Sequence, residues 1–126
     1  MRPMREERAH LIYRLRVFDA ASGRLLGHMT DITQEGMMLI GEKAVKPKRE
    51  FSLRMDLPRN VMKDGNLRFT AVSKWCRKDV RRGFYSMGFQ IQSISPEGLA
   101  VVRTLMRDFY REDLEGDSVT DLNPSL

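Results

Sequence analysis

Short runs of alternating apolar and polar residues, each closed by a turn, constrain the fold of this chain more than any other feature. The clearest run covers residues 51–57 and ends at Pro58, which cannot donate to a strand ladder. Its apolar members recur with the period of two that puts side chains on one face of a strand: Phe51, Leu53, Met55 and Leu57. The run therefore predicts a strand with one buried face.

Alternation, or a short continuous apolar run, predicts five further strands at residues 13–18, 25–30, 37–40, 67–75 and 84–91. Turn-forming residues separate them, as at Asp64-Gly65. Strands this short and this regularly spaced predict a mainly β fold, a small six-stranded antiparallel barrel.

The apolar period changes at Ser95, where we expect a C-terminal helix to begin. Ser95 suits the N-cap, Pro96 the first helical position, and Glu97 the positive end of the helix dipole. Apolar residues follow at helical spacing and form one stripe: Leu99, Val102, Leu105, Met106 and Phe109. This stripe is expected to pack against an open side or end of the barrel, although a dimer face would use the same pattern.

The length of 126 residues suits one domain. We expect a flexible arginine-bearing arm over residues 1–10, the barrel and helix over residues 11–112, and an acidic, disordered tail over residues 113–126. The formal net charge of +5 favours anionic partners. Because no apolar run approaches the roughly 20 residues of a membrane helix, no signal peptide is visible and Cys76 is the single cysteine, we expect a cytoplasmic protein without a membrane partner.

The inventory of reactive residues argues against an enzyme. The chain has two histidines, His10 and His28, and Cys76 has no evident base partner. The sequence shows neither a cluster with metal-ligand spacing nor a glycine-rich phosphate loop. We therefore expect no catalytic residue, no metal and no cofactor, and binding is the better class of function.

Two features favour an anionic ligand that carries aromatic bases. The arm holds Arg2, Arg5 and Arg8, and a guanidinium can fork onto a phosphate or stack on a purine. Trp75, the sole tryptophan, offers a stacking surface for a base. Each feature also has a simpler interpretation, a flexible basic tail for the arginines and a core anchor for the tryptophan.

A third feature is the polar connection 31–36 between two predicted strands. The Asp31 carboxylate can accept hydrogen bonds from a guanine edge, and the Thr33 hydroxyl can approach a phosphate. Gly36 permits close approach and tolerates the left-handed φ that such a turn often needs. A structural turn, capped by its own Asp or Thr side chain, needs no ligand and is the stronger interpretation of the six residues alone.

Taken in order, these parts resemble a PilZ domain over most of the chain. The matching pieces are the arm, residues 31–36 in the place of Asp/Asn-x-Ser-x-x-Gly, residues 72–75, residues 87–89 and the helix from Ser95. The resemblance implies a receptor for cyclic di-GMP that regulates bacterial motility, adhesion or exopolysaccharide output through a protein target.

The resemblance also implies a role for each candidate residue. Asp31 would read a guanine edge, Thr33 stands where the family has serine, and Gly36 would permit the close turn. The arm arginines would contact phosphates and stack on guanines, and a tryptophan would add a base platform. The implied ligand-binding residues are thus Arg5, Arg8, Asp31, Thr33, Gly36 and Trp75.

The arm departs from the family pattern. Members that bind the ligand carry Arg-x-x-x-Arg, whereas Arg5-Glu-Glu-Arg8 is one residue short and Met4 falls in the place of the first arginine. The two glutamates between the arginines would also repel a diphosphate ring. A second hypothesis is therefore a degenerate PilZ-like module that acts through protein contacts without the ligand. A third, single-stranded nucleic acid bound by residues 43–49 and 77–82, ranks last because the exposed faces lack repeated aromatic residues.

Overall fold

The computed structural model describes residues 9–108 and 110–111, which form a mainly β fold with one helix. The long strands are β1 (Ala9–Asp19), β2 (Leu25–Ile32), β3 (Gly36–Gly41), β4 (Glu50–Asp56), β5 (Asn66–Lys78) and β6 (Tyr85–Ser93). Helix α1 (Pro96–Asp108) and the short strand β7 (Tyr110–Arg111) follow. The six predicted strands and the helix are confirmed, whereas β7 has no counterpart in the sequence prediction.

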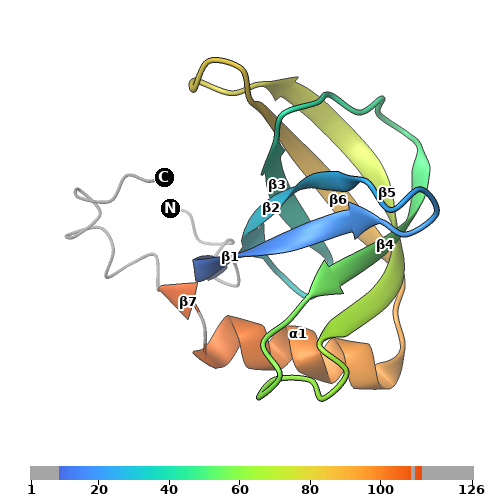
Figure 1. Cartoon of the computed structure of the whole chain (residues 1–126), viewed down its shortest axis with the longest axis vertical. Coiled ribbons are helices and arrows are strands. Elements are labelled where there is room, and N and C mark those ends of the chain that lie inside the picture. The colour runs from blue at the N-terminus through green and yellow to red at the C-terminus, as the bar shows by residue number, and fades with distance from the viewer. Residues whose placement is uncertain (1–8, 109, 112–126) are drawn as a thin grey trace.

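The long strands close into an antiparallel barrel, as predicted (Figure 1). Their order around the barrel is β1-β2-β3-β6-β5-β4, and β4 pairs again with β1. Strands that follow one another in the chain mostly pair with each other, so short turns make most of the connections. Strand β7 pairs with the start of β1, where Tyr110 lies opposite Leu11.

The barrel interior holds the apolar side chains that alternation predicted. Leu53 and Met55 of β4 are both 0% exposed, and Leu57 beyond the strand is also buried. Burying one such side chain fully contributes about 1.5–3 kcal/mol. Other apolar strand residues that are 0% exposed come from all around the barrel: Val17, Met29, Leu39, Ala71 and Met87.

Helix α1 lies across one end of the barrel, at the bottom of Figure 1. The Ser95 hydroxyl accepts a hydrogen bond of 2.9 Å from the Gly98 N–H, which confirms the predicted N-cap. Val102 and Leu105 of the predicted stripe are buried, and Val101 joins them. The stripe therefore closes the core at this end of the barrel.

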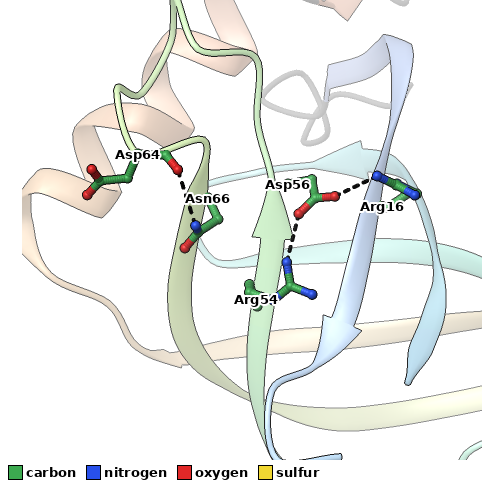
Figure 2. Close-up of polar contacts among 5 residues, drawn as sticks. All are labelled: Arg16, Arg54, Asp56, Asp64 and Asn66. Atoms are coloured by element: carbon green, nitrogen blue, oxygen red, sulfur yellow. Dashed lines mark hydrogen bonds and ion pairs between the residues drawn. The ribbon is translucent and has the colours of Figure 1, made fainter. Parts of the chain in front are cut away.

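The pairing of β1 with β4, which closes the barrel, covers few residues. It runs over Val17–Asp19 of β1, with Phe18 opposite Arg54. The Asp56 carboxylate accepts hydrogen bonds of 2.9 Å from both Arg16 and Arg54, and so bridges the seam (Figure 2). The Arg16–Asp56 ion pair therefore adds a polar contact across the shortest ladder in the barrel, whereas the Arg54–Asp56 pair lies within β4.

Most of the predicted arm and tail fall outside the described residues. Strand β1 begins at Ala9, so the last two residues of the segment expected to be an arm are strand. Arg2, Arg5, Arg8, Phe109 and the segment 113–126 lie outside the described part of the chain. Among the residues that are described, no helix is long and apolar enough to cross a membrane.

Candidate functional site

A β-bulge in β2 determines the direction of Asp31. Met29 pairs with Leu39 and Asp31 pairs with Met38, so Thr30 is an extra residue on β2. Side chains alternate between the two faces of a strand, and an inserted residue shifts this alternation by one position. Because Met29 and Leu39 are fully buried, an unbroken strand would point Asp31 into the core. The bulge instead places Asp31 on the outer face, beside Met38.

A second bulge, in β5, turns Trp75 in the same way. Ser73 pairs with Phe89 and Trp75 pairs with Gly88, so Lys74 is the extra residue on β5. Ser73 is 0% exposed and its side chain faces the interior. Trp75 lies two residues further along the strand, so an unbroken alternation would point its side chain to the interior as well. Beyond the bulge Cys76 packs against the core and Trp75 lies on the outer face. This position rules out the core-anchor interpretation of Trp75.

The two bulges align one residue from each of four adjacent strands. Asp31 of β2 pairs with Met38 of β3, Met38 pairs with Gly88 of β6, and Gly88 pairs with Trp75 of β5. We call these four residues the outer row. A cavity of about 190 Å³ opens along it. The described residues that line it are Asp31, Ile32, Thr33, Gly36, Met37, Met38, Lys74, Trp75, Gly88 and Phe89.

The cavity brings together all the predicted site residues that the structure describes. Asp31, Thr33, Gly36 and Trp75 come from three different strands or their turns and line one space. Asp31 is 6% exposed, so its carboxylate is largely removed from solvent. Arg5 and Arg8, the other two predicted residues, lie outside the described part of the chain.

Trp75 sits directly on Gly88. A Cβ atom built on Gly88 would overlap the Nε1 and Cε2 atoms of the indole, so only glycine leaves room for the ring in this position. The Arg77 guanidinium lies over the indole, with its Cζ 4.4 Å from the ring centroid. Gly88 was part of a sequence motif, but its role in leaving space for the Trp75 ring depends on strand register and was not predicted.

The Thr33 side chain caps the turn between β2 and β3. Its Oγ1 accepts hydrogen bonds from the N–H groups of Glu35 (3.1 Å) and Gly36 (3.0 Å). The Thr33 N–H in turn donates to the Gly36 carbonyl at 2.8 Å. This is the structural turn considered as the alternative interpretation, so the Thr33 hydroxyl shapes the edge of the cavity and is engaged with the backbone.

Of the two reasons predicted for Gly36, close approach and a left-handed φ, the structure shows a close approach, and the approaching group is the neighbouring strand. The φ of Gly36 is not positive, unlike those of the turn glycines Gly23, Gly65 and Gly83, so the expectation of a left-handed conformation is wrong. A Cβ atom at Gly36 would instead lie 2.6 Å from the Phe89 carbonyl oxygen. The missing side chain allows β3 to approach β6 closely, and the pairing with β6 explains the glycine.

Lys74 is a cavity residue that the sequence reasoning missed as a site residue. It is the extra residue of the β5 bulge, it is exposed, and it lines the cavity. Among the described lining residues, Asp31 is the one acid and Lys74 the one base. The cavity thus offers a hydrogen-bond acceptor, an aromatic face and a cation, a combination suited to a planar base attached to an anion.

The described residues contain no group of three or more His, Cys, Asp and Glu side chains placed to hold a metal ion. Cys76 is a free, half-buried thiol. The described lining of the cavity holds groups suited to hydrogen bonding, stacking and charge.

Comparison with known proteins identifies the fold. A family model described as PilZ domain matches residues 4–108. No curated protein sequence matches the chain significantly. The family match covers the six long strands and the helix, and includes the described residues that line the cavity.

Solved structures with the same fold share little sequence with this chain. MrkH of K. pneumonia, in its apo state, has a TM-score of 0.63 at 13% identity, covering 89% of this chain and 52% of MrkH. The PilZ domain of YcgR from Escherichia coli, solved with c-di-GMP, has a TM-score of 0.55 at 17% identity, covering 92% and 95% of the two chains. The Bacillus subtilis inhibitor of motility MotI/DgrA has a TM-score of 0.58 at 12% identity, covering 79% of this chain and 47% of its own. The chain spans about half the length of MrkH and MotI/DgrA.

Proposed function

This chain belongs to the PilZ family, and we propose that it is a cytoplasmic receptor for cyclic di-GMP with no catalytic activity. The observation that carries the proposal is the outer row, in which Asp31 and Trp75 line one cavity from opposite sides of the β3–β6 pair. One of the structural neighbours, the PilZ domain of YcgR, was solved with this ligand. The match in fold supports the same ligand class for this chain.

Guanine has the chemistry that the two ends of the outer row require. Its Watson–Crick edge presents N–H donors, and the carboxylate oxygens of Asp31 can accept hydrogen bonds from them. Its rings can stack on the indole of Trp75, a contact worth about 1–3 kcal/mol per base where it has been measured in other proteins. We therefore place a guanine along the outer row.

The volume of the cavity limits how much of the ligand it takes. At about 190 Å³ it is smaller than the roughly 300–1,000 Å³ of pockets that enclose a whole ligand. We propose that one guanine enters it while the phosphates stay at the rim, where Arg5 and Arg8 of the arm contact them. An arm that closes over the ligand would change the surface shown to a protein target, and so regulate motility, adhesion or exopolysaccharide output.

Titration calorimetry with cyclic di-GMP tests this function. We expect binding that weakens between about 50 mM and about 150 mM salt, because phosphate contacts are screened. Asp31→Asn keeps the shape but turns an acceptor oxygen into a donor, and should weaken binding about tenfold or more, since a hydrogen bond to a charged group contributes about 1.5–3 kcal/mol. No heat with about 100 µM ligand would refute the proposal.

Cyclic di-AMP is the matched control ligand. The Watson–Crick edge of adenine presents an acceptor where guanine presents an N–H donor, so the Asp31 carboxylate should reject it. Equal binding of the two dinucleotides would contradict the assigned role of Asp31 while leaving nucleotide binding in place.

The spacing of the arm arginines favours a second candidate function. In this alternative the chain is a degenerate PilZ module that does not bind cyclic di-GMP and acts through protein contacts. Met4→Arg would restore Arg-x-x-x-Arg with Arg8. Binding that appears only in this variant would support the degenerate module, whereas binding by the wild-type chain would exclude it.

A further inference from the structure

The cavity has a source of positive charge that belongs to the barrel and not to the arm. Lys74 lines the cavity and is exposed, and Arg77, also exposed, lies over the ring of Trp75. Both residues are on β5, on either side of the tryptophan. Neither belongs to the arginine pair or the β2–β3 turn from which a ligand role was expected.

The bulge at Lys74 is held in place by the loop between β3 and β4. The Ser73 hydroxyl donates to the Lys46 carbonyl at 2.6 Å and accepts from the Arg49 N–H at 3.0 Å. The Ser73 N–H also donates to the Arg49 carbonyl at 2.9 Å. Ser73 is 0% exposed, so these hydrogen bonds are shielded from water and pin β5 immediately before the extra residue. Lys74 therefore extends from an anchored strand position.

The position of Arg77 is also defined by a contact. Its guanidinium carbon lies 4.4 Å from the Trp75 ring centroid, at the outer face of β5. By contrast, Arg81 in the following hairpin forms an ion pair of 3.1 Å with Asp79. A planar guanidinium on an indole can remain beside a stacked base and still direct N–H donors to a phosphate.

We propose that Lys74 and Arg77 form a phosphate-binding pair on β5 that supplies the charge the arm's short arginine spacing does not. Lys74 contacts a phosphate at the cavity rim, and Arg77 contacts the ligand from its place over Trp75. This inference rests on the proposed function, since it concerns the same nucleotide. Its consequence is that binding depends on the barrel as well as on the arm.

Matched lysine variants on β5 test the pair. Lys74→Gln and Lys78→Gln remove the same charge from exposed positions of one strand, but only Lys74 lines the cavity. Trp75, the only tryptophan, reports ligand binding by its fluorescence at several salt concentrations. We expect Lys74→Gln to weaken binding about tenfold and to reduce the slope of log affinity against log salt by about one, as for the loss of one phosphate contact. Lys78→Gln should change affinity by less than about twofold, the size of a screened surface effect.

Two substitutions of Arg77 separate the effect of its charge from the effect of its planar shape. Arg77→Lys keeps the charge without the planar fork, and Arg77→Gln removes both, so the affinity should fall in that order while only Arg77→Gln lowers the salt slope. An effect through folding alone would leave the salt slope unchanged in every variant. Wild-type binding with equal affinities and slopes in Lys74→Gln and Lys78→Gln would overturn this inference and leave the proposed function intact. Absence of wild-type binding would overturn both.

Discussion

Replacing Gly88 with alanine is the sharpest test of the outer row. The new Cβ would overlap the indole of Trp75, so either the ring must move away from Gly88 of β6 or strands β5 and β6 must separate. Overpacking of this kind costs about 1–3 kcal/mol of stability. If the ring leaves, a stacked base loses its platform, worth about 1–3 kcal/mol, so cyclic di-GMP should bind roughly 5- to 150-fold more weakly.

Urea unfolding, tryptophan fluorescence and calorimetry together measure this effect. The emission of Trp75 should shift to the red as the half-buried ring moves into water. The control is a double-mutant cycle in which Trp75→Ala removes the overlapping ring, so that Gly88→Ala becomes nearly neutral in that background. Two results would refute the contact between the Trp75 ring and Gly88. One is unchanged emission and affinity in Gly88→Ala, and the other is the same loss of stability with and without the tryptophan.

Three other expectations concern stability. Asp56→Ala removes the partly exposed Arg16–Asp56 ion pair across the β1–β4 seam and the Arg54–Asp56 ion pair within β4, and should lower the free energy of unfolding by about 0.5–2 kcal/mol in urea titrations. Ser95→Ala removes the N-cap of α1 and should cost about 1 kcal/mol by the same assay, with Ser95→Asp as the variant that restores it. A hydrogen bond from the Arg81 backbone N–H lowers the pKa of Asp79 below 3.8. The ionised carboxylate therefore stabilises the β5–β6 hairpin above that pH, and this stabilisation is lost as the pH falls through the lowered pKa. The protection factor of the Arg81 amide, which donates to the Asp79 carboxylate, should therefore fall on acidification in the wild-type chain and show no such step in Asp79→Asn.

Much of the fold was predictable because its determinants are local. The alternation in β4 and the N-cap at Ser95 depend on residues a few positions apart, and both are found as predicted. Strand β7 is two residues long and is stabilised by pairing with β1. Two residues are too few to show an alternating pattern, so the sequence could not predict this strand. The barrel followed from the spacing of the turns.

The candidate site was predictable in its members but not in its geometry. Asp31, Thr33, Gly36 and Trp75 were selected from motif order, and the structure places all four around one cavity. The conformation of Gly36 was predicted wrongly, because the close approach of Phe89 comes from a strand distant in sequence. Lys74 was missed as a site residue because it lines the cavity only through a bulge that depends on its partner strand.

The sequence alone therefore determined which residues form strands, where the helix begins and which side chains are candidates for ligand binding. Only the tertiary structure decided which face of the barrel carries them. One extra residue in β2 and one in β5 reverse the alternation, and turn Asp31 and Trp75 from the core to the outer row. A bulge is defined by the register between two strands, which is set when distant segments pair, so the pattern of either strand by itself cannot reveal it.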